Sequence, residues 1–426
     1  MAIDSRYDVK HPQYWDAQAL HSELERIFDI CHGCRLCFNL CPSFPALFNF
    51  VDQRNLDAPQ QAPPGEFDQM ARQVVDLCYQ CKLCYNKCPY TPPHEFMLDF
   101  PQLMLRAKAQ KQRQQGMTLG DRVLGSPDLL GQWGSALAPL SNAANRFLPA
   151  RVILEKTIGI HRDRNLPEFH KETFARWFSR RPKKPGSNGR VALFYTCSVN
   201  YNDPDVGKAC VAVLEHNGIE VICPEQECCG MPYLDSGNIG EAAKRAERNA
   251  RRLAEYVRSG YDIVSPGPSC SLMLKAEAPH IVQNPEAELV AAHTFDLCQY
   301  LMQLHGQKKL NTSFTWRPGK IAYHLPCHLK HQNIGLKSRD LLRLIPGAEV
   351  ELIDRCSAMD GTWGMKTQYF QLSQQVAQKL YKGIERSEPQ LVVSDCSLAG
   401  LQIIYGTKRP VLHPVEVLAR AYGLAV

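Results

Sequence analysis

Two runs of cysteines near the start of the chain have the spacing of a metal–thiolate site. Each run reads Cys-x2-Cys-x2-Cys-x3-Cys-Pro. A tight turn with this spacing lets three thiolates converge on one face of a cluster, and soft thiolates select iron–sulfur clusters or zinc. Zinc would use two cysteine pairs and has no need for a triplet with a remote fourth ligand. We therefore predict two [4Fe–4S] clusters from Cys31, Cys34, Cys37 and Cys41 in the first run and Cys78, Cys81, Cys84 and Cys88 in the second.

The same spacing predicts how the two runs share their ligands. In two-cluster ferredoxins the fourth cysteine of each run binds the other cluster. We expect one cluster on Cys31, Cys34, Cys37 and Cys88, and the other on Cys78, Cys81, Cys84 and Cys41. Apolar residues at helical spacing predict helices over 17–31, 67–78 and 94–112. Residues 1–115 are therefore expected to form a helical ferredoxin domain with two clusters.

A third feature is the pair of adjacent cysteines Cys228 and Cys229. A disulfide between neighbours would be strained, so the pair is either two small buried hydrophobes or two ligands of one metal centre. From residue 189 onward, β-branched runs that end in cysteines alternate with helical segments, and the series restarts about 130 residues later. Ligands of such α/β sheets gather beyond the carboxyl ends of the strands. We therefore predict ligands at Cys197, Cys228, Cys229 and Cys270 in the first repeat and at Cys327, Cys356 and Cys396 in the second.

The two repeats differ in their supply of thiolates. The second repeat has Ser357 where the first has Cys229, so its centre is a three-iron cluster, a cubane with another fourth ligand, or a zinc ion. We predict that Gly230 and Gly361 let the backbone approach a cofactor closely. The candidates for an additional ligand or a proton carrier in the second repeat are His324, His328, His331 and Asp395.

Each of these four residues could instead be a capping or hydrogen-bonding group. Among them we select His328 as the predicted proton carrier. The three remaining cysteines of the repeats fall on helical faces or before a loop, and we interpret them as structural: Cys210, Cys223 and Cys298.

Composition limits the class of protein. The chain has 426 residues, of which 18 are cysteine, and its formal charge is +6. Its first residues mix charges and lack the apolar core of a signal peptide, so we expect a cytoplasmic location, where stable disulfides are rare. Lys and Arg are scattered among comparable numbers of Asp and Glu, and we therefore expect no nucleic-acid partner.

The segment between the ferredoxin-like runs and the repeats is expected to be a helical connector. Its short apolar helices are broken by Gly and Pro and carry basic residues at their edges. Such a segment either contacts a membrane or a partner protein or simply packs between domains. The domain limits that we predict are 1–115 for the ferredoxin domain, 116–186 for the connector, 187–307 for the first module and 308–426 for the second.

Together these motifs resemble the iron–sulfur subunits of anaerobic glycerol-3-phosphate dehydrogenases and the wider heterodisulfide-reductase-related "CCG-domain" proteins. The resemblance runs through "FYTCSVNYNDP", "CCGMP", "YHLPCH", "GTWGMK" and "VVSDC". The variant "DRCSAMDGTWGMK" is similar to bacterial iron–sulfur oxidoreductases found beside rubrerythrin-like proteins. The resemblance implies an α-helical ferredoxin domain followed by a duplicated α/β CCG-type module, with one or two further clusters of cubane, non-cubane or three-iron form in the modules.

The resemblance also implies an electron-transfer subunit of an oxidoreductase. Its partner would be a flavoprotein dehydrogenase or a rubrerythrin-like protein, and its acceptor a quinone or another carrier, with peripheral contact to the inner face of the cytoplasmic membrane. No nucleotide-binding fingerprint is present in the sequence, so hydride chemistry would belong to the partner. The alternatives are a self-contained reductase of a disulfide, a peroxide or a small ligand at an open cluster site between the modules, and a cluster-dependent sensor or structural protein.

Overall fold

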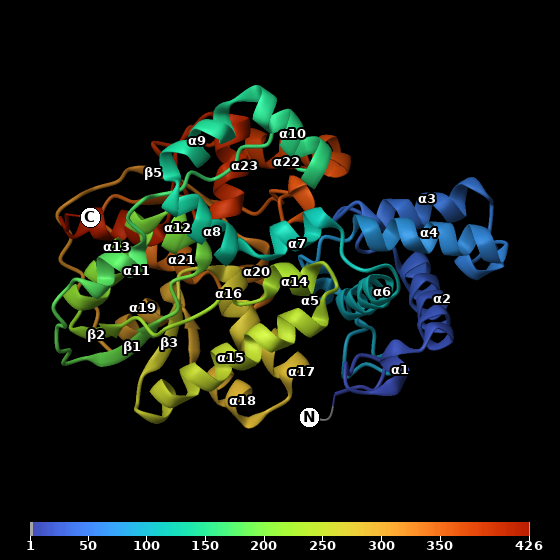
Figure 1. The fold of residues 1–426 in the computed structure, drawn as a ribbon, viewed down its shortest axis with the longest axis horizontal. Coiled ribbons are helices and arrows are strands. Elements are labelled where there is room, and N and C mark those ends of the chain that lie inside the picture. Colours follow the sequence, from blue (N-terminus) through green and yellow to red (C-terminus); the bar gives the residue numbers. More distant parts are fainter. Residues whose placement is uncertain (1–2, 426) are drawn as a thin grey trace. The chain divides into compact units, whose positions relative to one another are not determined.

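The computed structural model describes residues 3–425, which fall into two compact units. One unit consists of Met1–Met117 and Tyr233–Glu241, and the other of Thr118–Pro232 and Ala242–Val426. The segment Tyr233–Glu241 therefore belongs to the N-terminal unit, although the sequence on either side of it belongs to the other unit. Figure 1 shows the elements of both.

The N-terminal unit is helical. Its core contains the apolar faces of three helices, with Phe28, Leu47 and Val74 fully buried. Asp16 begins the long second helix by accepting a hydrogen bond from the amide of Ala19. The helices are α1 (Pro12–Trp15), α2 (Ala17–Cys34), α3 (Ser43–Gln53), α4 (Pro64–Leu77), α5 (Leu83–Lys87) and α6 (Phe100–Gln115), with a 3-10 turn η1 at Pro59–Gln61.

The helix predicted over 94–112 begins later than expected. Asp99 accepts a hydrogen bond from the amide of Gln102 and is the N-cap of α6, and Pro101 lies in its first turn. Residues before a proline disfavour the helical region, and Asn and Asp favour cap positions over helix interiors. The apolar residues of 94–98 therefore lie in turns rather than in the helix.

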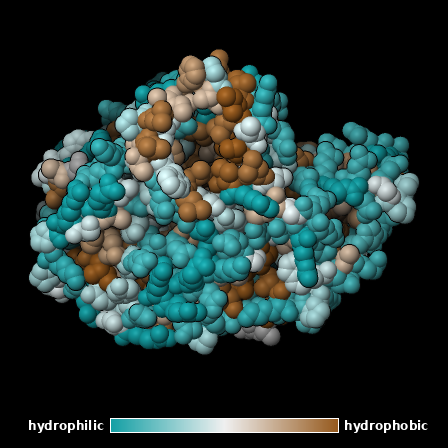
Figure 2. All heavy atoms as spheres, viewed as in Figure 1, coloured by the Kyte–Doolittle hydropathy of each residue, from teal (hydrophilic) through white to brown (hydrophobic). Residues whose placement is uncertain are grey.

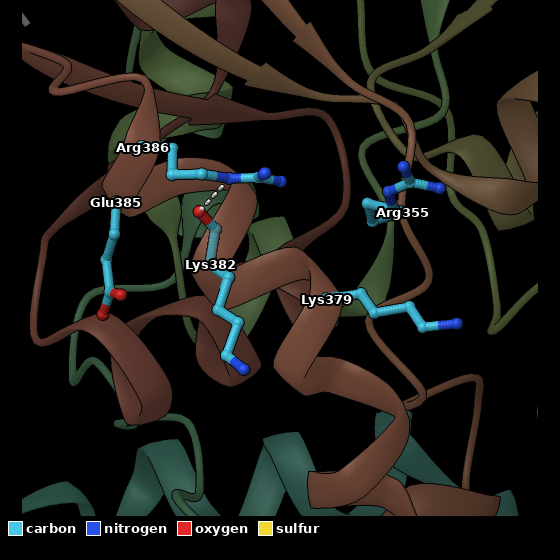
Figure 3. A pocket seen from close by; sticks show the side chains of 5 residues that line it. All are labelled: Arg355, Lys379, Lys382, Glu385 and Arg386. Atoms are coloured by element: carbon cyan, nitrogen blue, oxygen red, sulfur yellow. Dashed lines mark hydrogen bonds between the residues drawn. The ribbon is translucent and has the colours of Figure 1, made fainter.

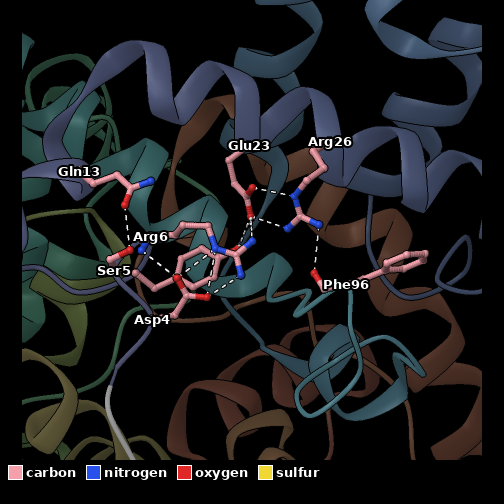
Figure 4. Close-up of polar contacts among 8 residues, drawn as sticks. Asp4, Ser5, Arg6, Gln13, Glu23, Arg26 and Phe96 are labelled. Atoms are coloured by element: carbon pink, nitrogen blue, oxygen red, sulfur yellow. Dashed lines mark hydrogen bonds and ion pairs between the residues drawn. The ribbon is translucent and has the colours of Figure 1, made fainter.

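An ion-pair network holds the start of the chain against α2 (Figure 4). The buried carboxylate of Glu23 accepts hydrogen bonds from Arg6, Arg26 and the hydroxyl of Tyr7. Arg26 also donates to the carbonyl of Phe96 at 3.0 Å. Burial alone would raise the pKa of Glu23, but the hydrogen bonds and charges of the two arginines and the hydroxyl lower it overall.

The second unit contains two parallel four-stranded sheets with the same strand order. The orders are β2-β1-β3-β4 and β6-β5-β7-β8. This arrangement confirms the predicted duplication of an α/β module. The strands are β1 (Gly189–Leu193), β2 (Ile219–Ile222), β3 (Asp262–Ser265), β4 (Thr294–Asp296), β5 (Lys320–His324), β6 (Glu349–Ile353), β7 (Leu391–Ser394) and β8 (Val411–Leu412).

Helices pack around these sheets, and one apolar core includes residues of both modules, among them Leu193, Leu297, Tyr323 and Val393. The helices of the first module are α12 (Cys197–Tyr201), α13 (Pro204–His216), α14 (Met231–Asp235), α15 (Ile239–Arg258), α16 (Pro268–Leu272), α17 (Ala278–Val282), α18 (Pro285–Ala292) and α19 (Leu297–Gly306), with a π-helical turn η2 at Met273–Glu277. Those of the second are α20 (Cys327–His331), α21 (Lys337–Leu342), α22 (Phe370–Arg386), α23 (Ser397–Thr407) and α24 (Pro414–Ala421), with 3-10 turns η3 (Trp363–Met365) and η4 (Thr367–Tyr369).

The strand that the sequence predicts before the double cysteine is much shorter than its apolar run. β2 ends at Ile222, and residues 223–229 follow as an extended loop. Pro224 lies in that loop, and proline cannot donate to a ladder. The double cysteine therefore follows the strand at the end of a loop, not at the tip of the strand itself.

The connector forms five helices that belong to the second unit: α7 (Leu119–Gly125), α8 (Pro127–Ala136), α9 (Ala138–Arg146), α10 (Leu148–Ile158) and α11 (Phe174–Ser179). The inner face of α8 packs closely, because a Cβ at Gly131 would lie 2.1 Å from the ring of Tyr201. Arg151, which the sequence places at a basic edge, is instead buried and donates to the carbonyls of His161 and Arg164.

The outer face of the connector is apolar (Figure 2). Trp133 is 72% exposed and Leu140 is 67% exposed. Figure 2 shows apolar side chains gathered over the region of α8, α9 and α10. We call this surface the connector patch, and it consists of Leu119, Leu129, Leu130, Trp133, Leu137, Leu140, Phe147, Leu148 and Ile153. Within residues 3–425, none of the helices combines the length and the apolar character required to cross a bilayer.

Candidate metal centres

The two N-terminal cysteine runs take different local structures. Cys31 and Cys34 lie in the last turn of α2, which ends at Arg35 with a φ of 52°. In the second run, Cys78 follows the end of α4 and Cys84 lies in α5. The backbone between them turns sharply, because Gln80 and Lys82 both have positive φ angles. These turns direct the sulfurs of each run inward.

The thiols of the two runs interact as two quartets. Burial raises the pKa of Cys31, and its thiol neighbours Cys37, Cys88 and Cys34 raise it further. Burial likewise raises the pKa of Cys84, followed by Cys81, Cys41 and Cys78. Each quartet thus takes three thiols from one run and the last thiol from the other, which is the grouping expected from the spacing.

The donor set of each quartet fits an iron–sulfur cluster. A cavity is lined by Cys41, Cys78, Cys81 and Cys84. The amide of Tyr90 donates to Cys88 Sγ at 3.4 Å, and Gln80 Nε2 lies 3.7 Å from Cys78 Sγ. Donors to sulfur stabilise thiolates and tune cluster potentials. Raised thiol pKa values describe the protein without metal, and a bound cation reverses them by deprotonating its ligands.

Within the N-terminal unit, Lys108 links the second run to the segment Tyr233–Glu241. Its Nζ donates to the carbonyl of Cys78 at 2.5 Å and to that of Asp235 at 3.2 Å. Gly237 has a φ of +88°, and a Cβ there would lie 2.6 Å from the backbone of Lys108. Glycine at 237 therefore lets this segment lie directly on α6.

The first module brings its four predicted ligands into mutual contact. Hydrogen bonds from Cys197 and from Cys229 lower the pKa of Cys228 well below its usual value. Cys229 Sγ in turn lies 3.4 Å from Cys270 Sγ. Both members of the double cysteine are buried, at 3% and 4% exposure. The four sulfurs form a continuous set, which is the geometry that a polynuclear thiolate centre requires.

Helix α15 positions the double cysteine. The side chain of Asn249 accepts from the amide of Glu227 at 3.0 Å and donates to the carbonyl of Cys228 at 3.3 Å. Gly230 has a φ of +96°, and a Cβ there would lie 3.1 Å from the carbonyl oxygen of Ala242. The close backbone neighbour of Gly230 is therefore α15. Its amide donates to the thiol of Cys228.

One further charged pair lies beside the first-module thiols. Asp128 on α8 interacts electrostatically with Cys197 and Cys228, and Arg245 on α15 forms an ion pair with it at 2.5 Å. Neither residue was predicted from the sequence, because the connector and α15 are distant in the chain and neither residue belongs to a motif.

The second module presents a mixed set of donors. Ligand atoms of Cys327, His328 and Asp360 all lie within 4.8 Å of one another. Asp360 also interacts electrostatically with Cys396, whose pKa is raised to about 11 by burial first. Asp360 was not among the predicted residues, although it directly precedes Gly361, which has a φ of +49°. A thiolate, imidazole and carboxylate set fits zinc or a cluster iron with a ligand other than cysteine.

Cys356 is held in the loop after β6. The amide of Ala358 donates to Cys356 Sγ at 3.2 Å, and the carbonyl of Ala358 accepts from Ser373 Oγ at 2.7 Å. Ser373 on α22 thus fixes this loop in the second module, as Asn249 on α15 fixes the corresponding loop in the first.

His328 is buried between the two modules. Its Nδ1 lies 2.8 Å from the hydroxyl of Ser269, and its Nε2 lies 3.6 Å from a carboxylate oxygen of Asp360. The imidazole therefore joins a hydroxyl of the first module to an acid of the second. This placement is compatible with the predicted proton carrier, because a histidine beside a carboxylate can exchange a proton with it.

The other three candidates in the second module have different roles. Both ring nitrogens of His324 are engaged, one by Ser394 Oγ and one by the carbonyl of Arg355, and burial lowers its pKa to about 4. His331 is the last residue of α20 and half-buried. The carboxylate of Asp395 accepts hydrogen bonds from Tyr323 and Ser338. The interpretation as hydrogen-bonding groups therefore fits His324 and Asp395.

Cys298, interpreted from the sequence as structural, lies in a buried acidic cluster. Its Sγ lies 3.7 Å from Asp395, and Asp296 is the third member of the group. Burial, and then the charge of Asp395, raise the pKa of Asp296 to about 7. Asp296 also accepts a hydrogen bond from the amide of Cys298 and so caps α19.

Comparison with known proteins agrees with this architecture. The family profile of a cysteine-rich domain, called CCG, matches residues 191–275 and again residues 321–404. The profile of the citrate utilization protein B Fer4-like domain matches residues 23–114. The fold and its cysteines thus define the class: an iron–sulfur protein with a ferredoxin-like domain and two CCG domains.

Two curated relatives narrow this class. The chain is 32% identical to the C subunit of the anaerobic glycerol-3-phosphate dehydrogenase of Escherichia coli over 308 residues, which cover 71% of this chain and 77% of the relative. It is also 32% identical to "Lactate utilization protein A" of Geobacillus kaustophilus over 245 residues, or 54% of this chain and 98% of the relative. The chain belongs to the family of that glycerol-3-phosphate dehydrogenase component, and it is an iron–sulfur protein related to oxidoreductase subunits.

Proposed function

We propose that the protein is the electron-transfer subunit of an oxidoreductase complex. The observation that carries this proposal is the pair of buried thiol quartets in the N-terminal unit, together with the four contacting thiols of the first module. When bound, [4Fe–4S] clusters supply one-electron carriers. The residues of the chain hold them, exclude water from them and donate hydrogen bonds to their sulfurs.

The electron donor in this proposal is a flavoprotein dehydrogenase or a rubrerythrin-like protein, and the acceptor is a quinone or another carrier. The name of the glycerol-3-phosphate dehydrogenase relative supports a partner of the first kind. The connector patch supports peripheral contact with a membrane, because its exposed apolar side chains are flanked by the exposed cations Arg122 and Lys156.

The relay is tested with the anaerobically purified full chain. The N-terminal clusters should be reduced by a low-potential dye and reoxidised by a soluble quinone analogue, with their paramagnetic resonance signals lost on reoxidation. Cys34→Ser should damage the cluster of its own quartet first. The proposal fails if the chain binds zinc at these positions, or if its clusters stay reduced with every quinone and protein acceptor tried.

Membrane contact is tested by flotation with anionic vesicles at low salt, where electrostatic attraction is strongest. The double substitution Trp133→Ser with Leu140→Ser should release the protein from the vesicles. Ile404→Ser, at an exposed apolar residue outside the connector patch, is the matched control. Equal flotation of the double variant and the wild type would leave the packed-connector interpretation.

A second candidate function is supported by the mixed donors of the second module. An incomplete thiolate shell leaves a coordination position for a disulfide, a peroxide or a small ligand, as open zinc sites do. His328 would carry the proton at Nε2 towards Asp360, while the hydroxyl of Ser269 orients the ring at Nδ1. Turnover of such a substrate by the isolated chain with a reduced dye, lost in His328→Gln, would favour this function.

A further inference from the structure

A charged cavity lies on the second module, apart from its cysteines (Figure 3). Its volume is about 500 Å³. Helix α22 supplies four of its lining residues and the loop after β6 supplies the fifth. Figure 3 shows their side chains, which are Arg355, Lys379, Lys382, Glu385 and Arg386.

The cavity has an excess of unneutralised positive charge. Four of its lining groups are cationic and one is a carboxylate. Within residues 3–425, none of the four cations forms an ion pair; the guanidinium of Arg386 donates only to the carbonyl of Lys382, at 3.3 Å. A neighbouring lysine behaves differently, since Lys330 pairs with Asp354 at 2.6 Å. Like charges in one hollow repel each other unless an anion lies among them.

The scaffold holds these cations in place. Lys379, Lys382 and Arg386 share one exposed face of α22, because they are three and four residues apart. The opposite face of the helix is buried through Ala377, Leu380 and Ile384. The carbonyl of Arg355 accepts from His324 Nε2 at 3.2 Å. The positions of the cations are therefore determined by the core of the module, although their side chains reach solvent.

We propose that this cavity binds a small anionic ligand through a phosphate or carboxylate group. Guanidinium groups grip such oxyanions with two parallel hydrogen bonds, and lysines add point charges. The volume lies within the range of roughly 300–1,000 Å³ that holds small-molecule ligands. Because Arg355 directly precedes Cys356, a bound anion would lie beside the backbone that carries a cysteine of the second module.

Calorimetric titration of the anaerobic full-length protein tests this site, with inorganic phosphate and malonate as separate probes at low salt. Lys382→Gln with Arg386→Gln should weaken the binding of the preferred probe by about tenfold or more, since charge-assisted hydrogen bonds are lost. The matched control, Lys308→Gln with Lys309→Gln, removes the same charge from an exposed turn after α19 and should leave binding unchanged.

The two probes distinguish a phosphate-bearing ligand from a carboxylate-bearing one, and tighter binding of either supports the proposal. Binding of neither probe overturns it, and so does an equal loss in the control variant. Binding of polyglutamate without either small anion would also overturn it, in favour of an acidic protein surface. Thermal unfolding checks that the double variant is folded; if it is not, Arg355→Gln makes the same test from outside α22.

Discussion

The two α/β modules have the same strand order but offer different donors at equivalent places. In the first, Cys229 follows Cys228 and joins Cys197 and Cys270 in one set of contacting thiols. In the second, Ser357 follows Cys356, and the acid of Asp360 lies beside the cysteines instead.

This difference separates the two sites chemically. An all-thiolate shell is closed and suits electron relay, whereas a shell completed by other donors leaves room for a ligand or a proton. The duplication therefore kept the frame that positions the loops, through Asn249 in one module and Ser373 in the other, while the donors changed.

The largest effect is expected from Cys229→Ala. Because Cys229 contacts the thiols on both sides of it, its loss should remove the first-module cluster and lower the iron content by about four. The paramagnetic resonance signals of the N-terminal clusters should remain. Cys210→Ala, at another fully buried cysteine of the same module, should leave the iron content unchanged. Full iron content in Cys229→Ala would make the double cysteine only a pair of buried hydrophobes.

The next effect concerns the donor missing from the second module. Ser357→Cys places a thiol where the first module has Cys229. We expect the second centre to gain a thiolate ligand and its spectrum to shift towards that of the first centre, measured by Mössbauer spectroscopy of iron-57-enriched protein. An unchanged spectrum would show that the loop, rather than the missing sulfur, determines the second site.

A smaller effect is expected from Asp360→Asn. This change keeps the size of the side chain but removes the charge that faces His328 Nε2 at 3.6 Å. The first-module and N-terminal signals should be unaffected, whereas the signal of the second centre should change. The pH dependence of that signal should lose the titration of the His328–Asp360 pair. If the pH profile is unchanged, the histidine has only a structural role.

The smallest effect serves as a control outside both modules. Glu23→Gln removes the carboxylate that Arg6 and Arg26 bind, at a cost of roughly 1–3 kcal/mol at neutral pH. Because the pKa of Glu23 is lowered in the folded protein, its stabilisation is present above the unfolded value near 4.5 and is lost as pH falls below it. Chemical unfolding at several pH values should show the difference between variant and wild type shrinking in acid. A constant difference would contradict this account.

Much of the fold and most of the candidate ligands could be predicted from the sequence. The cysteine runs report local spacing, and the repeat reports a whole module, so both are legible without contacts. Asp360, Asn249 and Asp128 were not predicted, because each acquires its role from residues on another element. The burial of Arg151 and the early end of β2 were missed for a related reason: carbonyls to bind and a proline in the loop override what charge and apolar runs suggest.

The central claim is that the two modules hold separate and chemically different centres. Its most direct test is to compare the Mössbauer and paramagnetic resonance spectra of the anaerobic full chain in Cys229→Ala and in Cys356→Ala. The account predicts that Cys229→Ala removes an all-thiolate cluster and that Cys356→Ala leaves this cluster intact while it alters a second centre. Loss of one and the same signal in both variants would contradict it, because the two modules would then share a single centre.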